Sequence, residues 1–588
     1  MITFPFKDQR AGQETIIKET EAAVKNGDTL MIHAATGMGK TAPVIYGALK
    51  ASLEKGLRVV FLTARHTHQN IVYDTIRKIN AVSSDKITFT GINGKLSMCL
   101  LENSVEPHLF IEFCRAVREQ DMCNFYSNVF SKSKDIKSRA LQALSSDISD
   151  PGSIMNAGRK FEVCPYEISL LNAKKSKVIV ANYSHVFDQD VAPSFMTKAG
   201  INAKNSVLIV DEAHNLHSKI VDINSFSMSL KTVEKAYDEA ILSGEIALSR
   251  KIDGVVSEAR KVKAETVINL TDTFSVSDIE SMDSVIKQKE DSYNIPAMFT
   301  LKRFATFLSK VDDSYLQYAS VENGRVKINI TALDPSDNSR QTIKSFASSI
   351  LISGTFKPMD VFADLLGIKD AKKVVIDDGV LSSNRLIINE TDLTSKFSDR
   401  NKQIELIAER IDDLLENFRH NIIVFFTSYA FIDSVSKLLK HTDKVIKESR
   451  NMGREDKEAI ISEMSKPGKC LFAVIGGNFS ESIGVRNNAV KMIVIVGIPF
   501  EPPSVKLKAF QAYYQKKFSN GFEYAQVLPA MVKTMQAAGR GIRSSTDRAV
   551  ILLLDSRFDS AAFRKFLPDG IKTVNGSPIN FIKESGFN

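Results

Sequence analysis

One segment of this chain has the residue types and spacing to bind a phosphate. Residues 34–41 read Ala-Ala-Thr-Gly-Met-Gly-Lys-Thr, which fits G-x-x-x-x-G-K-[ST] except that Ala34 replaces the first glycine. Backbone N–H groups of such a loop converge on a phosphate, and the helix that follows adds a favourable dipole. Lys40 would reach the terminal phosphates, and Thr41 would hold Mg²⁺. The segment predicts a nucleotide site, with an ordinary strand-to-helix turn as the alternative; its contacts would come from Thr36, Gly37, Met38, Gly39, Lys40 and Thr41.

Two adjacent carboxylates could supply the chemistry of hydrolysis. An apolar run over residues 206–210 ends in Asp211-Glu212-Ala213-His214. Two carboxylates at the end of a buried strand would be costly without a cation nearby. A nucleotide with its Mg²⁺ would provide that cation. Asp211 could then hold the metal shell, and Glu212 could orient or deprotonate the attacking water.

Polar residues near both ends of the chain could complete this site. Residues 536–543 read Gln-Ala-Ala-Gly-Arg-Gly-Ile-Arg, and a spacing of three places Arg540 and Arg543 on one helix face. Arginine in such a position stabilises the charge of phosphoryl transfer, although a solvated basic face is the alternative. Near the N-terminus, Gln13 follows Arg10 and is a candidate reader of an adenine edge. The alternative is two exposed residues at a helix start.

The cysteines are unevenly distributed. Four of the five lie in one region with the spacing C-x14-C-x8-C-x40-C, while Cys470 stands apart. Zinc sites commonly contain close pairs of cysteines, and this region has none, so zinc is disfavoured. Wide, irregular spacing suits an iron-sulfur cluster, which needs four convergent sulfurs. On spacing alone, buried cysteines without a ligand are an equal alternative to a cluster bound by Cys99, Cys114, Cys123 and Cys164.

Composition limits the kind of protein this can be. Five cysteines in 588 residues are too few for a disulfide scaffold, which indicates a reducing compartment. The N-terminus has no signal-peptide core, and no apolar run approaches the length of a membrane span. We therefore expect a cytoplasmic protein without a membrane contact. The net charge of +8 mildly favours a polyanionic partner.

The periodicity predicts two sets of strands that alternate with helices, which is typical of parallel α/β sheets. The first set covers residues 29–35, 58–64, 86–90, 177–183, 206–210 and 348–355, and the second covers 421–428, 471–477, 490–499 and 549–555. Between about residues 216 and 321 the pattern is helical. One predicted apolar helix face there consists of Leu301, Phe304, Phe307, Leu308, Val311, Tyr315 and Leu316.

Taken together, these residues resemble the iron-sulfur DNA helicases of the XPD type. The likeness follows the order of the helicase motifs through nearly the whole chain. Arg10 and Gln13 match the Q-like motif, and the successive motifs I, Ia, II, III, IV, V and VI match residues 34–41, 63–69, 211–214, 353–355, 424–429, 476–484 and 536–543. The clustered cysteines between motifs Ia and II are the most discriminating part.

The resemblance implies an α/β fold with two RecA-like motor domains and two insertions in the first. The first motor would contain residues 1–90, 166–217 and 322–370, and the second would contain residues 371–588. Residues 91–165 would hold a [4Fe-4S] cluster, and residues 218–321 would form a helical arch. The implied enzyme is a monomer that uses ATP and Mg²⁺ to move 5′ to 3′ on single-stranded or forked DNA and serves DNA repair. Its candidate DNA contacts are Arg65, Thr67, Ser428 and Tyr429.

Two departures from the family pattern keep other interpretations open. Motif V usually reads Ser-Glu-Gly-Ile-Asp, whereas this chain has Ser482 and Gly484 at the third and fifth positions. A switch that hydrolyses ATP without unwinding is therefore an alternative, and so is an RNA helicase, because motors mainly hold the nucleic-acid backbone. The sequence ends at Asn588, soon after motif VI, which favours an archaeal-type, free-standing enzyme.

Overall fold

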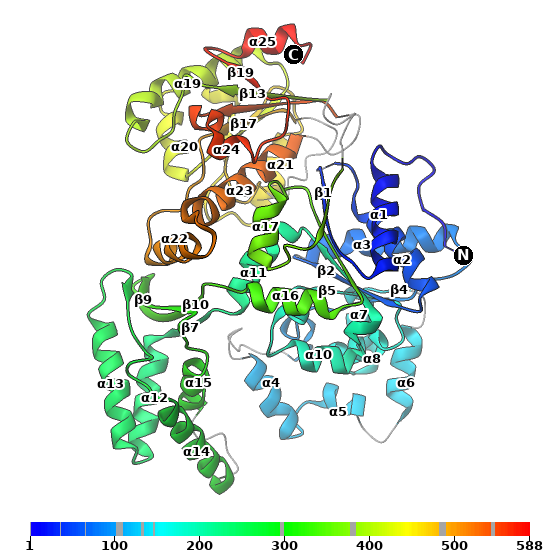
Figure 1. Ribbon diagram of the computed structural model, residues 1–588, viewed down its shortest axis with the longest axis vertical. Coiled ribbons are helices and arrows are strands. Elements are labelled where there is room, and N and C mark those ends of the chain that lie inside the picture. Colours follow the sequence, from blue (N-terminus) through cyan, green and yellow to red (C-terminus); the bar gives the residue numbers. More distant parts are fainter. Residues whose placement is uncertain are drawn as a thin grey trace. The chain divides into compact units, whose positions relative to one another are not determined.

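The computed structural model describes residues 2–35, 37–64, 66–101, 110–130, 134–144, 148–293, 299–376, 384–480, 490–541 and 547–587. The chain forms two compact units (Figure 1). Unit 1 contains residues 1–216, 340–500 and 527–588, and unit 2 contains residues 217–339 and 501–526. Within the described ranges, we find no helix with the length and hydropathy of a membrane span.

The first sheet of unit 1 has eight parallel strands in the order β12-β1-β11-β6-β2-β5-β3-β4. Its central strands are continuous apolar runs buried on both faces, as a parallel sheet covered by helices requires. The strands are β1 (Thr29–Ala34), β2 (Arg58–Thr63), β3 (Phe89–Gly91), β4 (Ile148–Ser149), β5 (Val178–Asn182), β6 (Ser206–Asp211), β11 (Ser348–Ser353) and β12 (Lys372–Ile376).

Helices connect these strands and share an apolar core with them. Ile32 of β1, Val44 of α2 and Val72 of α3 belong to one buried cluster. The helices are α1 (Gln13–Asn26), α2 (Thr41–Glu54), α3 (His66–Val82), α9 (Ser184–Phe187), α10 (Ala192–Ala199), α16 (Ser336–Ser345) and α17 (Met359–Leu366). The cysteine-rich segment adds η1 (Leu96–Met98), α4 (Phe110–Glu119), α5 (Asn124–Phe130), α6 (Lys134–Ala143), α7 (Pro151–Phe161) and α8 (Pro165–Ala173).

The second sheet of unit 1 has seven parallel strands in the order β15-β16-β14-β17-β18-β13-β19. They are β13 (Arg385–Glu390), β14 (Asn421–Phe426), β15 (Val445–Lys447), β16 (Cys470–Val474), β17 (Val490–Val496), β18 (Ala549–Leu554) and β19 (Lys572–Val574). The accompanying helices are α19 (Arg400–Asn417), α20 (Tyr429–Ser436), α21 (Arg454–Glu463), α23 (Leu528–Ala538), α24 (Ala561–Arg564) and α25 (Ile579–Glu584). The predicted α/β class with two RecA-like sheets is confirmed.

Unit 2 combines helices with an antiparallel sheet in the order β7-β10-β9-β8. Its strands are β7 (Phe226–Ser229), β8 (Thr266–Val267), β9 (Tyr315–Glu322) and β10 (Arg325–Ala332), and its helices include α12 (Leu230–Leu242), α13 (Ile246–Arg260), α14 (Val276–Tyr293), α15 (Phe299–Leu308) and α22 (Val505–Phe518). The placement of Tyr315 and Leu316 on a helix was wrong. They begin β9, because the hairpin with β10 pairs their backbones across the sheet.

Two segments lie outside the regions that the sequence assigned to them. Strand β12 extends the first sheet beyond residue 370, since Leu30 to Ala34 of β1 pair with Lys372 to Ile376. Residues 501–526, expected in the second motor, belong to unit 2. The carboxylate of Asp334 fixes this second segment, accepting hydrogen bonds from Tyr513 and Lys517 of α22. Both segments take their place through partners far away along the chain.

Candidate functional site

The loop between β1 and α2 has the backbone conformation of a phosphate-binding turn. Gly37 and Gly39 have φ angles of 91° and 73°, in the left-handed region that favours glycine. At Gly39, an added Cβ would also lie 3.1 Å from Nε2 of Gln13. Lys40 and Thr41 follow at the start of α2. Thr36 lies outside the described residues.

Arg10 and Gln13, at the start of helix α1, support this loop. Nη1 of Arg10 donates to the Gly37 carbonyl at 2.8 Å, and Nε2 of Gln13 donates to the Met38 carbonyl at 2.9 Å. The Gln13 oxygen accepts from the Arg10 backbone N–H at 3.1 Å, and the side chain is buried. These bonds hold the loop. Adenine readout by Gln13 stays a prediction.

The two carboxylates at the end of β6 lie beside the loop lysine. Nζ of Lys40 is 3.2 Å from Oε1 of Glu212. Burial and the charge of Glu212 raise the pKa of Asp211, so this carboxylate favours a nearby cation. Burial opposes the charge of Glu212 as well, but the positive charge of Lys40 outweighs burial and lowers the pKa of Glu212. The site thus keeps one carboxylate charged through Lys40.

The backbone at Glu212 is held in an unusual conformation. Its φ angle is 49°, in the left-handed region that side chains other than glycine seldom adopt. The hydroxyl of Tyr183, which follows β5, donates to the carbonyls of Asp211 and Glu212. Strained residues of this kind gather at functional sites, where the surroundings fix them. Tyr183 is a supporting residue that the sequence did not reveal, because only the sheet order brings β5 close to β6 through β2.

His214 joins three of the segments that match helicase motifs. Its Nδ1 lies 2.6 Å from Oγ of Ser353, at the end of β11, and its Nε2 lies 2.6 Å from Nε2 of Gln536 in α23. Burial lowers the pKa of His214 to about 4, so the ring is neutral at pH 7. A proton on Nδ1 lets the ring donate to Ser353 and accept from the Gln536 amide. Nδ1 of His214 also lies 3.4 Å from Oε2 of Glu212, so His214 connects Gln536 with one of the two carboxylates.

Other predicted site residues are described only in part. Nε of Arg540 donates to the Gln536 carbonyl at 3.2 Å, which places this arginine next to the His214 relay. Arg543, Arg65, Ser482 and Gly484 lie outside the described residues, and so do the side-chain details of Thr67. Gln69, at the end of the same segment, is buried and donates to Oδ1 of Asn182 at 2.9 Å.

A cavity of about 680 Å³ opens within unit 1 next to this relay. Residues of both sheets line it, among them His33, Thr355, Lys357, Arg385 and Gly539. The described lining does not include Lys40 or Glu212. The described lining of this cavity therefore does not include the two residues that are predicted to act in hydrolysis and that contact each other.

The four clustered cysteines converge although they are far apart in sequence. Cys99, Cys114, Cys123 and Cys164 all line one pocket, which Lys95 and Arg118 also line. Within the described residues, no three His, Cys, Asp or Glu side chains are arranged to hold a single metal ion. A four-iron cluster takes one thiolate on each iron, so its ligands are spread more widely than those of one ion.

The surroundings of these thiols suit a negatively charged cluster. Burial raises the pKa of Cys164 to about 12, while backbone N–H groups of Glu167 and Tyr166 at the start of α8 donate to its sulfur. The Leu101 N–H does the same for Cys99. Hydrogen bonds to sulfur and nearby cations are the means by which proteins tune iron-sulfur ligands. Cys470 is buried in β16, away from this pocket.

The carboxyl end of the second sheet carries two of the four predicted DNA contacts, Ser428 and Tyr429. Ser428 caps α20, its Oγ accepting the Phe431 N–H at 3.2 Å. The hydroxyl of Tyr429 donates to Oε1 of Glu448 at 3.1 Å, and the guanidinium of Arg450 lies 5.4 Å from the centre of the Tyr429 ring. Glu448 was not predicted as a site residue, because a buried carboxylate after a three-residue strand has no local signal.

Known proteins resemble this chain over nearly its whole length. Residues 63–233 match the family model DEAD_2, and residues 411–574 match a model described as the helicase C-terminal domain. An ATP-dependent DNA helicase XPD from Sulfolobus acidocaldarius is 26% identical over 582 residues, which cover 95% of this chain and 98% of the relative. The chain is therefore similar to XPD-type helicases along nearly its whole length.

Another relative and two solved structures show the same similarity. An ATP-dependent DNA helicase CHL1 from Kluyveromyces lactis is 25% identical over 559 residues, covering 81% of this chain and 67% of the relative. A solved structure titled XPD helicase superposes with a TM-score of 0.66 at 22% identity and covers 97% of this chain and all of that one. The structure of S. tokodaii Xpd4 gives a TM-score of 0.63 at 16% identity, with 96% and 99% covered. These two structures support the XPD fold.

Proposed function

We propose that this chain is an ATP-dependent DNA helicase that moves 5′ to 3′ on single-stranded DNA and acts in DNA repair. The observation that carries the proposal is the contact of Lys40 with Glu212, together with the relay from His214 to Ser353 and Gln536. The curated relatives named above are ATP-dependent DNA helicases. The direction of movement and the repair role rest on the family resemblance.

The contacts suggest how the residues share the work. The γ-phosphate of ATP competes with Glu212 for the ammonium of Lys40. When Lys40 moves to the phosphate, Glu212 loses its strongest cationic partner, its pKa rises, and it becomes a better base for the attacking water. Asp211 and Thr41 would hold Mg²⁺, which neutralises phosphate charge. Gln536, Arg540 and Arg543 would complete the site from the second motor, so that hydrolysis depends on motor closure.

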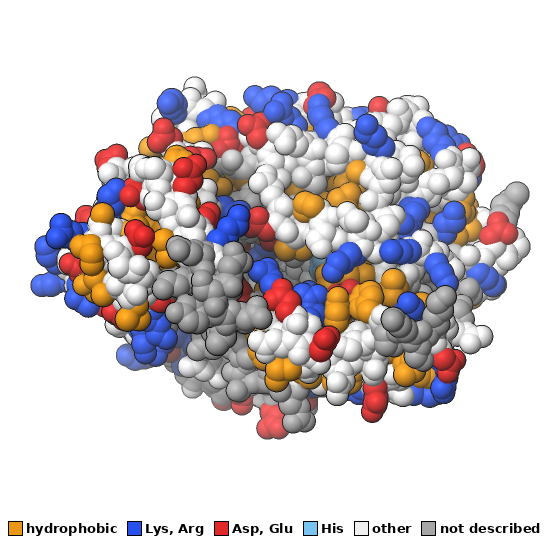
Figure 2. Space-filling model, turned by 90° about the horizontal axis from the view of Figure 1, so that it is seen from below, with side chains coloured by type: hydrophobic (Ala, Val, Ile, Leu, Met, Phe, Trp, Pro, Cys, Tyr) orange, Lys and Arg blue, Asp and Glu red, His pale blue; other side chains and the backbone are white. Residues whose placement is uncertain are grey.

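The surface charge is compatible with a nucleic-acid partner. The net charge is +8, and Lys and Arg side chains are spread over much of the face shown in Figure 2. Phosphate contacts supply most of the sequence-independent affinity of such proteins. We propose Arg65, Thr67, Ser428 and Tyr429 as DNA contacts; of these, Ser428 and Tyr429 lie at the carboxyl end of the second sheet.

Lys40→Ala tests the enzymatic part of the proposal. The substitution removes the cation that would bind the terminal phosphates, so we expect ATP hydrolysis in the presence of single-stranded DNA to fall by about 10³-fold or more. The measurement is phosphate release with matched DNA and RNA strands. Lys50→Ala is the control, because Lys50 lies on the same helix and contacts Glu21 on the surface. Full turnover in Lys40→Ala would reject the assignment, and stimulation by RNA alone would favour an RNA helicase.

Unwinding separates a helicase from a switch that only hydrolyses ATP. A duplex with a 5′ single-stranded tail should be opened in an ATP-dependent reaction, while the same duplex with a 3′ tail should stay closed. Opening from the 3′ tail would reverse the proposed direction. Hydrolysis without opening of either substrate would favour the switch.

We also propose that Cys99, Cys114, Cys123 and Cys164 hold a [4Fe-4S] cluster, which would fix the fold of this segment. Protein purified without oxygen should be brown, with broad visible absorbance, whereas zinc would leave it colourless. Cys114→Ser should lose this absorbance and duplex unwinding but keep part of the ATP hydrolysis, because the hydrolytic residues lie elsewhere. Cys470→Ala is the control and should keep the colour, since Cys470 is buried in β16. A colourless wild-type protein with bound zinc would contradict the cluster.

A further inference from the structure

The segment between β13 and α19 presents an aromatic ring to solvent. Phe397 is 87% exposed, whereas Leu393 and Ser395 of the same segment are buried. An isolated exposed apolar side chain needs no explanation by itself. A role for Phe397 therefore depends on whether its backbone is held in place and on which side chains lie beside its ring.

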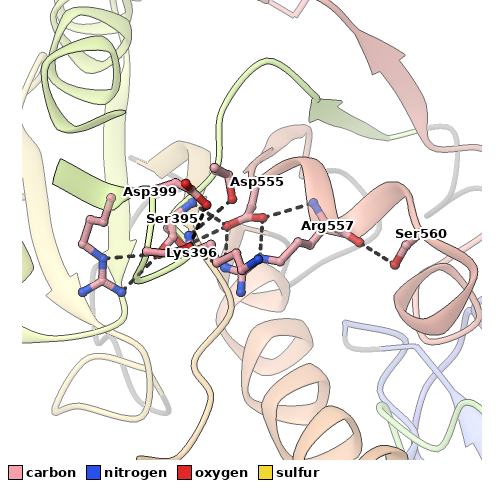
Figure 3. Close-up of polar contacts among 9 residues, drawn as sticks. Ser395, Lys396, Asp399, Asp555, Arg557 and Ser560 are labelled. Carbon is pink, nitrogen blue, oxygen red and sulfur yellow. Dashed lines mark hydrogen bonds and ion pairs between the residues drawn. The ribbon is translucent and has the colours of Figure 1, made fainter. Parts of the chain in front are cut away.

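Buried polar contacts hold this segment firmly (Figure 3). Asp555 follows β18 and has no exposed surface, and its carboxylate accepts the Ser395 N–H at 2.9 Å and the Ser395 hydroxyl at 2.8 Å. Arg557 neutralises the same carboxylate, with Nη2 at 2.7 Å and Nε at 2.8 Å from its two oxygens. Burial alone would raise the pKa of Asp555, but the bonds from Arg557 and Ser395 lower it.

The turn that carries Phe397 is closed on its other side too. The Lys396 carbonyl accepts the N–H groups of Asp399 at 2.9 Å and Arg400 at 2.8 Å. Gly497, at the end of β17, has a φ angle of 89°, and an added Cβ would lie 2.0 Å from Oγ of Ser395. Only glycine at this position lets the segment lie directly on the end of β17. The ring of Phe397 therefore projects from a fixed backbone.

The segment reaches across the sheet to the predicted DNA contacts. Strands β18 and β17 separate β13 from β14, and the segment passes over the ends of both. The guanidinium of Arg400 lies 4.6 Å from the centre of the Phe431 ring in α20. Phe431 in turn donates its N–H to Ser428. Phe397 thus shares an edge of the second sheet with Ser428 and Tyr429.

Positively charged side chains lie near the exposed ring of Phe397. Lys396 is exposed, and the Arg400 guanidinium lies 5.8 Å from the centre of the Phe397 ring. The nearby carboxylate of Asp399 accepts the Ser398 hydroxyl, and that of Asp555 is neutralised by Arg557. Proteins that bind single strands combine cations that follow the backbone with aromatic rings on which bases stack.

From this arrangement we infer that Phe397 is a stacking platform for a base of single-stranded DNA, flanked by Lys396 and Arg400 for the adjoining phosphates. The inference rests on the proposed function and adds a binding residue to it. Asp555 and Arg557 are positioning residues, because they act on the ring only through Ser395. Stacking of this kind accepts any base, as a translocating protein requires.

Binding of an oligothymidine strand and of an abasic strand with the same number of phosphates tests the inference. Phe397→Ala should weaken oligothymidine binding about ten-fold, as expected from the loss of one stacked base. Binding of the abasic strand should not change, because that strand has nothing to stack. Phe397→Trp should restore oligothymidine binding, while Phe397→Leu, which is apolar but not aromatic, should not. Arg400→Gln should instead flatten the dependence of affinity on salt.

Leu438→Ala is the matched control, because Leu438 is a 43% exposed apolar residue that follows the C-terminal end of α20, whereas Ser428 and Tyr429 lie at its N-terminal end. It should bind both strands like the wild type. The inference would be overturned if Phe397→Ala lost equal affinity for both strands, or lost no affinity for either. If the wild-type protein bound neither strand, the proposed function itself would fail, which keeps the two outcomes distinct.

Discussion

Glu448 shows how a single buried carboxylate can organise two loops that meet at one edge of a sheet. Its Oε1 accepts the hydroxyl of Tyr429 at 3.1 Å and the N–H of Asn478 at 2.6 Å, and its Oε2 accepts the N–H of Val474 at 2.9 Å. An added Cβ at Gly477 would lie 2.6 Å from the same carboxylate. Glu448 therefore fixes the start of the segment that matches motif V against the residue that ends the motif IV match.

We expect Glu448→Gln to weaken the stimulation of ATP hydrolysis by DNA more than ATP hydrolysis without DNA. Glutamine has one acceptor oxygen, so its NH₂ group must face a backbone or hydroxyl donor, and the loss of one buried hydrogen bond costs about 1–3 kcal/mol. The DNA concentration that gives half-maximal ATP hydrolysis should rise about five-fold, while hydrolysis without DNA should not change. Both the half-maximal DNA concentration and the rate without DNA are measured by following phosphate release while DNA is titrated.

Glu390→Gln provides the matched comparison for that titration. Glu390 is a buried carboxylate at the end of β13 in the same sheet, and it pairs with Nε of Arg410 at 2.8 Å. Its loss should change the unfolding temperature without changing the requirement for DNA. A similar rise in the DNA concentration for half-maximal hydrolysis in both variants would mean that Glu448 acts only through the stability of the sheet.

The sequence could reveal site residues whose signal is local. Lys40, Asp211 and Glu212 stand at the ends of apolar runs, and the structure brings Lys40 and Glu212 into contact. Glu448 has no such signal, because it follows a three-residue strand and its role depends on partners in other loops. Asp555 does end a buried strand, as Asp211 does, so the same reasoning applied to β18 would have singled it out.

At the scale of the element, helix α22 joins unit 2 through polar contacts with the end of β10. Asp334 accepts hydrogen bonds from Tyr513 and Lys517, and Lys517 also donates to the Ser336 hydroxyl at 2.8 Å. Tyr514 lies between these two residues, is buried, and contacts Nε2 of His217 at 3.3 Å. Helix α22 therefore packs into unit 2 both through charged hydrogen bonds to Asp334 and through the buried aromatic ring of Tyr514.

Asp334→Asn should reduce the stability of unit 2 in a manner that depends on pH. Burial alone would raise the pKa of Asp334, but the bonds from Lys517, Tyr513 and Ser336 lower it from 3.8 to about 2. A lowered folded pKa adds stability that is present above the unfolded value and is lost as pH falls towards the folded value. The difference in urea midpoint between wild type and Asp334→Asn should stay constant from pH 7 to about 4 and then narrow.

Asp253→Asn is the control for this series, because Asp253 is exposed on α13. Its urea midpoint should follow the wild type at every pH. A difference between wild type and Asp334→Asn that did not narrow below pH 4 would show that the Asp334 charge is not what holds α22.

Strands and helices were predictable where a single strong pattern of apolar residues identified them. The continuous apolar runs of β1, β6, β14 and β17 identified the strands of both sheets without any partner. The hairpin of β9 and β10 was missed, because Leu316 happens to continue the helical spacing from Leu308 and only pairing with β10 distinguishes the two. Helix α22 was expected within the second motor, but its place in unit 2 depends on Asp334, which lies more than 150 residues earlier.

At the scale of the whole molecule, the residues proposed for hydrolysis come from the two different sheets of unit 1. Lys40, Asp211 and Glu212 belong to the first sheet, whereas Gln536 lies beside the second and reaches the first through His214. Cooperation between two sheets explains how a movement of the second sheet could be sensed at Glu212. It also explains why the order of motifs in the sequence predicts the enzyme class better than any single motif does.

The division of unit 2 between residues 217–339 and 501–526 has a consequence for biosynthesis. When a ribosome has completed the first segment, the surface that will receive Tyr514 and Lys517 still lacks its covering helix. At a synthesis rate of about 5–20 residues per second, the remaining stretch takes on the order of ten to forty seconds. Throughout that interval the nascent chain exposes an unfinished face. Cellular factors that shield nascent chains would therefore have their strongest effect on this protein during those seconds.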